Sequence, residues 1–141
     1  MFDGCSNLKE LNINNFYTAN VKTMEGVFRN CISLSSLNLE SFKTRNVLYM
    51  NDMFKNCYKL NNLTISDFDF ANVIHMNNMF SGCSSLTSID IDLKKAHVKN
   101  IYQMFYGCKK LTSLEMINFN MTDIKNYSNL FYDCENLEYI K

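Results

Sequence analysis

Six cysteines are the residues of this 141-residue chain best able to carry chemistry. They stand at positions 5, 31, 57, 83, 108 and 134, so successive cysteines are 26, 26, 26, 25 and 26 residues apart. An even number of cysteines is compatible with a disulfide framework, but a ladder of equivalent side chains pointing the same way suits the sulfur dihedral poorly. Because free cysteine is among the residues most often buried, we predict a column of core thiols.

The sequence gives little support for a metal site or a catalytic centre. It contains no Cys-x-x-Cys pair, and His75 and His97 occupy different positions of the repeat, so we expect no zinc site. Asp90, Asp92 and Glu115 could gather Ca²⁺ from adjacent strands, but dedicated calcium sites supply more oxygen ligands. A glycine-rich phosphate loop, a nucleophile elbow and an HExxH motif are also missing from the sequence. We therefore expect no cofactor, no metal and no enzymatic activity.

The composition favours a folded domain that has no net charge and therefore no strong overall electrostatic field. Hydrophobic residues make up 47% of the chain and charged residues 20%, which argues against disorder. Lysine plus arginine equal aspartate plus glutamate at 14 each, so no net positive charge is available to attract nucleic acid. No apolar run approaches the roughly 20 residues of a membrane span. We expect no nucleic-acid partner and no direct membrane insertion of this segment.

The regular cysteine spacing indicates a solenoid of stacked repeats. Full copies run over residues 14–39, 40–65, 66–91 and 92–116, with partial copies at both ends. We predict one repeat domain over residues 1–141, with five to six rungs. Met1 falls where later copies carry Met53, Met79 and Met104, and neither end has a polar capping repeat, so we expect a fragment of a longer array. Uncovered apolar ends would also favour end-to-end self-association.

Two periodicities alternate within each copy. Apolar residues such as Val47, Met50, Met53 and Phe54 fall on one face of a helix, which predicts a helix of about nine residues ending before each cysteine. The expected N-caps are Asn20, Asn46, Asn72 and Asp123. The expected left-handed residues at the ends of the helices are Gly4, Asn30, Asn56, Gly82, Gly107 and Asp133. After the cysteine, apolar residues alternate with polar ones, which predicts a short strand with one buried face.

A specific consensus carries a family resemblance. The segments NVLYMNDMFKNCYKLNNLTI (46–65) and NVIHMNNMFSGCSSLTSIDI (72–91) resemble the BspA-like leucine-rich repeats of surface proteins, and the pattern covers essentially the whole chain. The resemblance implies an α/β fold, a leucine-rich-repeat solenoid with a parallel sheet on the concave face and short helices on the convex face. It also implies a cell-surface or secreted adhesion protein. A cytoplasmic location stays open, since free thiols are compatible with it.

The outward strand positions form the candidate ligand face. Fifteen such positions carry five acids and no bases, which favours a basic or polar partner. The predicted ligand-binding residues are Glu10, Asn12, Asn38, Glu40, Asn62, Thr64, Asp90, Asp92 and Glu115. Small polar residues would also serve simply to keep a sheet soluble. Two functions stay open: a non-enzymatic module that binds a protein or glycan, and a structural spacer that displays another domain and binds nothing.

Overall fold

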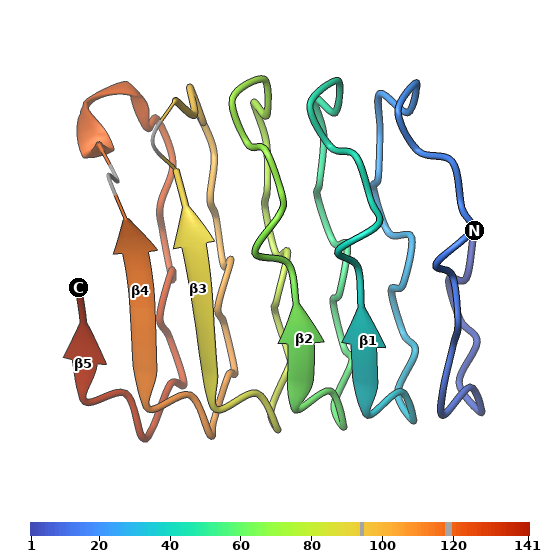
Figure 1. Cartoon of the computed structure of the whole chain (residues 1–141). Helices are drawn as coiled ribbons and strands as arrows, with labels where there is room; N and C mark the ends of the chain where they lie inside the picture. Colours follow the sequence, from blue (N-terminus) through green and yellow to red (C-terminus); the bar gives the residue numbers. More distant parts are fainter. Residues whose placement is uncertain (94, 118–119) are drawn as a thin grey trace.

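The chain coils into a stack of similar rungs (Figure 1). The computed structural model describes residues 1–93, 95–117 and 120–141, and the two termini lie at opposite ends of the stack. Its strands are β1 (Ser36–Asn38), β2 (Asn62–Thr64), β3 (Ser88–Asp92), β4 (Ser113–Ile117) and β5 (Tyr139–Ile140). A short 3-10 helix, η1, spans Met121–Asp123. The strands run in one direction on one side of the stack, and the returning segments lie on the other side (Figure 1).

The strands pair in parallel with residues of equivalent repeat position opposite each other. Strand β1 pairs with β2 and places Leu37 opposite Leu63. Strand β4 lies between β3 and β5, with Asp90 opposite Glu115. In β1, β3 and β4 the alternate apolar residues are buried, as the period of two predicted.

The predicted helices before the cysteines are wrong. Within the described residues the structure contains no α-helix, so the fold is a solenoid of parallel strands and turns, and the α/β assignment with helices on a convex face does not hold. In place of a helix, successive tight turns precede each cysteine. Lys55 N donates to Asp52 O at 3.1 Å, and Cys57 N donates to Phe54 O at 3.1 Å. Both bonds join residues three apart, whereas an α-helix joins residues four apart.

The remaining amides of these segments bond to the next rung. Asp52 N, Phe54 N and Asn56 N donate to Asn77 O, Met79 O and Ser81 O at 2.9, 2.9 and 2.7 Å. The same pattern recurs in the other copies, so a second column of hydrogen bonds between rungs runs along the side opposite the strands. A helix would have used these amides internally, because its N–H groups point along its own axis. In the stack, the same N–H groups donate to carbonyl groups of the next rung.

Two left-handed residues in each rung explain the choice of turns. The predicted set Gly4, Asn30, Asn56, Gly82, Gly107 and Asp133 is confirmed, with φ between 60° and 78°. A second set, four residues earlier in the chain, was not predicted: Gly26, Asp52, Asn78, Gln103 and Asn129 have φ between 53° and 59°. A type II turn requires a positive φ at its third residue, which is Asn56 in the turn closed by Cys57 N and Phe54 O, and Asn78 in the turn closed by Met79 N and Met76 O at 3.4 Å. Glycine, asparagine and aspartate tolerate a positive φ best. Each set interrupts any helix, and a helix of nine residues is marginal in any case.

The proposed N-caps have other roles. Asn46 Nδ2 donates to Ala19 O, and Asn72 Nδ2 donates to Arg45 O, each at 2.8 Å. These side chains therefore tie one rung to the previous one. Asp123 is the last residue of η1 and not the residue before a helix, so this N-cap is also wrong. The N-cap actually observed is Asn120, whose side chain accepts a hydrogen bond from Thr122 N.

The core consists of columns of identical side chains, as predicted. Met50, Met53, Met76, Met79 and Met104 are fully buried. A stack of six phenylalanines runs through the rungs with centroid separations of 5.4–5.8 Å and interplanar angles of 3–15°: Phe2, Phe28, Phe54, Phe80, Phe105 and Phe131. Each rung thus covers the apolar face of its neighbours, which a single repeat could not do alone.

Substitutions at Asn78 distinguish the observed turn from a helix. The Asn78 Oδ1 atom is buried without a hydrogen-bond partner, so removing it breaks no side-chain bond. At its φ of 53°, Asn78→Gly is expected to be more stable than Asn78→Ala by about 1 kcal/mol. In a helix the order would be reversed by a similar amount. Urea unfolding of both variants measures the difference.

The neighbouring Asn77 provides the matched control. Its φ is not positive, so Asn77→Gly should be less stable than Asn77→Ala. If the alanine variant were more stable than the glycine variant at both positions, the left-handed turn at Asn78 would be contradicted.

Candidate ligand-binding site

The predicted ligand residues lie on one side of the stack, here called the strand face. It consists of the outward side chains of β1 to β4, of residues 10–14 and of Glu40, which follows β1. Glu10, Asn12, Asn38, Glu40, Asn62, Asp90 and Asp92 are exposed, while Thr64 and Glu115 are half-buried. Their exposure follows from strand alternation, because the apolar residues between them occupy the core.

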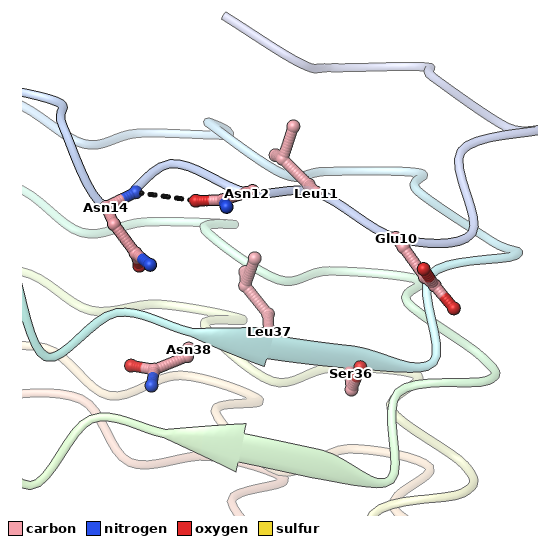
Figure 2. Close-up of a pocket in the computed structure, with 7 residues that line it drawn as sticks. All are labelled: Glu10, Leu11, Asn12, Asn14, Ser36, Leu37 and Asn38. Atoms are coloured by element: carbon pink, nitrogen blue, oxygen red, sulfur yellow. Dashed lines mark hydrogen bonds between the residues drawn. The ribbon is translucent and has the colours of Figure 1, made fainter.

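A groove opens on the strand face between the first rung and β1 (Figure 2). It has a volume of about 400 Å³ and is lined by Glu10, Leu11, Asn12, Asn14, Ser36, Leu37 and Asn38. The two leucines lie in the middle of the groove, with Glu10 and Ser36 toward one end and Asn14 and Asn38 toward the other. The groove therefore combines an apolar centre with polar groups that can donate and accept hydrogen bonds.

The groove exists because the first rung is not paired to β1 as a strand. Residues 10–13 form no strand in the structure, and Ser35 N donates to Lys9 O at 3.4 Å just before them. Asn14 N donates to the side chain of Asn12 at 3.2 Å (Figure 2), as Glu40 N does to the side chain of Asn38 in the next rung. Three of the predicted residues, Glu10, Asn12 and Asn38, are thereby brought together.

The groove end of the strand face keeps negative charge that other residues do not neutralise. Glu10 and Glu40 form no ion pair with another described residue. Glu40 is positioned by Asn38, whose Nδ2 donates to Glu40 Oε2 at 3.2 Å and whose Oδ1 accepts from Glu40 N at 2.9 Å. At the other end of the face, Lys141 Nζ lies 3.8 Å from Glu115 Oε1. Asp90 on the second sheet also forms no ion pair with another described residue, so acidic side chains without an ion pair occur on both sheets.

The strand face is divided between β2 and β3. The described strands form one sheet of β1 and β2 and another of β3, β4 and β5. A cavity of about 140 Å³, lined in part by Leu63, Thr64 and Asp90, lies between the two sheets. The nine predicted residues therefore do not form one uninterrupted patch: Asp90, Asp92 and Glu115 belong to the second sheet, away from the groove.

The structure brings together two of the three residues of the calcium hypothesis. Asp90 and Glu115 are register partners on β3 and β4, as predicted. Among the described residues, however, no group of three or more histidine, cysteine, aspartate or glutamate side chains is arranged to hold a metal ion.

No helix in the described chain combines the length and apolar character that crossing a bilayer requires.

The cysteine column is built as the buried thiol ladder that was predicted. Cys31, Cys57, Cys83 and Cys108 are buried, whereas Cys134 is half-buried and Cys5 is exposed at the end of the stack. Each thiol from Cys31 onward donates to the phenylalanine carbonyl of the previous rung; the Sγ to O distance is 3.1 Å from Cys57 to Phe28 and 3.2 Å from Cys83 to Phe54. Burial raises the pKa of the Cys57 thiol to about 12 and raises that of Cys83 well above its usual range. These thiols are packing groups, because the reactive thiolate is disfavoured.

Sequence reasoning missed four residues of the groove as ligand groups. Asn14 and Ser36 are among the fifteen outward strand positions counted from the sequence, but nothing in the sequence showed that they border a groove. Leu11 and Leu37 were assigned to the buried face of the strands, and Leu37 is indeed buried while Leu11 is half-buried. The only available signal was the turn-forming pair Asn14 and Asn15 directly after the first strand segment.

Comparison with known proteins identifies a sequence family. A family model described as "Mycoplasma protein of unknown function, DUF285" matches residues 1–92 and residues 62–140. Among solved structures, the chain is similar to a leucine-rich repeat protein from Bacteroides ovatus, with 20% identity and a TM-score of 0.33. This similarity covers 99% of the present chain and 56% of that protein, so the chain spans little more than half of its length. No curated protein matches the chain.

Proposed function

This chain belongs to the DUF285 family of Mycoplasma proteins of unknown function, and we propose that it is a non-enzymatic recognition module that binds a partner on its strand face. The partner is a protein with basic residues, bound first through the groove between residues 10–14 and β1. The BspA-like consensus of the repeats supports a further part of the proposal, that the module belongs to an adhesion protein exposed on the cell surface.

The groove is the observation that carries the proposal. It offers Leu11 and Leu37 as an apolar contact, surrounded by amide and hydroxyl groups that fix orientation. Glu10 and Glu40 provide charge that the chain itself leaves unpaired, so a basic partner can pair with it without first displacing an internal lysine.

A displayed peptide library tests the predicted preference. Random peptides selected on phage against the wild-type chain are expected to be enriched in lysine and arginine. Their binding to the Glu10→Lys variant should be at least about ten-fold weaker, and weaker still for Glu10→Lys with Glu40→Lys, because like charges then meet across the interface. Biolayer interferometry with the purified variants measures the affinities at two salt concentrations.

Glu138→Lys is the matched control, since it makes the same charge change on an exposed residue of the last rung. It should leave peptide binding unchanged at physiological salt, where exposed charges are screened beyond about 8 Å. Peptides without basic enrichment, or equal loss in the Glu10→Lys and Glu138→Lys variants, would contradict the groove as the binding site. A failure to select any peptide would favour the spacer function.

A further inference from the structure

Another cavity lies away from the strand face, on the side of the tight turns. It has a volume of about 600 Å³ and is lined by residues of four successive rungs. Its lining includes Lys55, Tyr58, Ser81, Ser84, Tyr106 and Lys109. We call it the turn-side notch and propose that it binds a neutral glycan by enclosing one sugar ring.

The notch arises from three small residues in one rung. Lys55, Ser81 and Tyr106 occupy equivalent repeat positions, as do Tyr58, Ser84 and Lys109. The middle rung therefore has serine at two positions where both neighbouring rungs have long side chains. Because neighbouring rungs stand about 4.7–4.9 Å apart, the two walls are about 10 Å apart. That spacing accommodates one ring in van der Waals contact, at about 3.5–4.0 Å, with each wall.

Gly82 completes the floor of the notch. Its φ is 78°, and a Cβ atom added to it would lie 2.8 Å from Asn56 Oδ1 and 3.3 Å from Asn56 Cα, so a larger residue cannot be placed there without movement. In the preceding rungs the equivalent residues Asn30 and Asn56 are joined side chain to side chain at 2.9 Å and cover the backbone. That cover ends at Gly82 and Gly107.

Ser81 is a polar group in the notch that the protein leaves without a partner. Ser81 lines the cavity, and its hydroxyl makes no hydrogen bond with another described residue. The hydroxyl oxygen is open to the notch, so a ligand hydroxyl can bond to it without displacing a protein group.

The walls match an uncharged polyhydroxylated ligand. Each side has one tyrosine and one lysine, and Tyr58 is 47% exposed, so its ring is available to stack on a sugar. Both lysines are already paired: Lys55 Nζ lies 3.5 Å from Asp52 Oδ1, and Lys109 Nζ lies 3.4 Å from Asp133 Oδ2. Paired charges attract no net ionic ligand but still hydrogen-bond to hydroxyl groups.

An extended peptide fits the notch less well. Strand-like binding of a peptide requires free backbone amides at an edge. Here Gly82 N already donates to Tyr106 O at 2.7 Å, and Gly107 N donates to Tyr132 O at 2.9 Å. The groups that remain available are side chains, which favours sugar over main chain.

A glycan array tests the proposal with the double variant Ser81→Lys and Ser84→Tyr. These substitutions give the middle rung the residues of the preceding one, so they fill the notch while keeping side chains that the repeat already accommodates. The wild-type chain is expected to bind neutral oligosaccharides on an array that also carries sialylated and sulfated ones. The double variant should bind the same neutral oligosaccharides at least ten-fold more weakly while melting within a few degrees of the wild type.

The Glu10→Lys variant separates this proposal from the strand-face function, because it should keep full glycan binding. Binding only to sialylated or sulfated glycans, absence of binding to every neutral oligosaccharide, or unchanged binding by the notch-filled variant would each overturn the proposal. If the notch-filled variant lost peptide binding instead, the notch would be a protein site. Loss of glycan binding in the Glu10→Lys variant alone would place the glycan on the strand face.

Discussion

The Phe80→Ala variant is expected to lose about 3–5 kcal/mol of folding free energy. Phe80 is fully buried, and its ring stacks on Phe54 at 5.5 Å and on Phe105 at 5.4 Å. Alanine removes the buried ring surface and leaves a cavity between two rings that are held apart by the rung spacing, so neither ring can move in to fill it. Equilibrium unfolding in urea measures the loss.

Phe131→Ala is the matched control at the end of the same column. Phe131 is half-buried and stacks on one phenylalanine of the described chain, Phe105, so its loss should cost less than half as much. Phe80→Leu, which keeps much of the volume, should fall between the wild type and Phe80→Ala. Equal losses at Phe80 and Phe131 would contradict a stability that depends on neighbouring rungs.

The position of the substitution also determines how the chain unfolds. In a solenoid each rung contacts only its neighbours, so a defect in a central rung separates the stack into two weaker halves. The strand side is already divided between β2 and β3, and the rung of Phe80 lies at this division. Hydrogen exchange in Phe80→Ala is therefore expected to protect the two halves to different degrees, whereas the wild type should show a more even protection.

The repeat and its core could be predicted from the sequence because both depend on a pattern. The cysteine spacing established the period, and the apolar positions established which side chains face inward. Val47, Met50, Met53 and Phe54 are all fully buried, as expected. The left-handed residue before each cysteine was also predictable, since glycine, asparagine and aspartate are the residues that adopt a positive φ most easily.

The helix prediction failed because two structures share one periodicity. Successive tight turns return apolar side chains to the same side every three or four residues, as a helix does, so the spacing alone cannot separate them. The separating signal was the residue type at positions 26, 52, 78 and 129, where glycine, aspartate or asparagine lies in the middle of the supposed helix. All of these are poor helix formers, and the amides around them find partners in the next rung.

The grooves could not be predicted because they depend on how one rung meets the next. The exposure of Glu10 and Asn38 follows from strand alternation, but their approach to one another requires that the first rung leaves β1 unpaired locally. The turn-side notch similarly requires the comparison of three rungs at equivalent positions. When the rungs are aligned at equivalent positions, Ser81 and Ser84 are the small residues between the larger side chains of the two neighbouring rungs.

Raising the pH above 9 is expected to destabilise the chain steeply through its buried thiols. Burial raises the pKa of Cys31 to about 11 and that of Cys57 to about 12, and it raises the pKa of Cys83 and Cys108 strongly, whereas an unfolded thiol keeps a pKa near 9. Below pH 9 these four thiols are protonated in both states, so their contribution is fully present. Above pH 9 the unfolded state releases protons that the folded state retains, and the stability falls as pH rises toward 12.

Each such thiol lowers the free energy of unfolding by up to about 1.4 kcal/mol per pH unit, so the four together reach about 5 kcal/mol per unit. Urea unfolding at pH 8, 9.5 and 10.5, with a reductant present, measures the slope. Cys83→Ala should reduce it by about one quarter, whereas Cys5→Ala, at an exposed position, should leave it unchanged. An unchanged slope in Cys83→Ala would show that other groups control the alkaline transition.

The same burial makes the thiols resistant to oxidation in the folded chain. Because the thiolate is the reactive species, iodoacetamide at pH 8 should modify Cys5 in the native state long before Cys57, Cys83 or Cys108. Mass spectrometry of partly labelled protein resolves the order, and early labelling of Cys83 would contradict the ladder. A folded solenoid of this kind can keep its central cysteines reduced in an oxidising environment, so the redox state of these thiols reports their packing and does not report the compartment in which the protein resides.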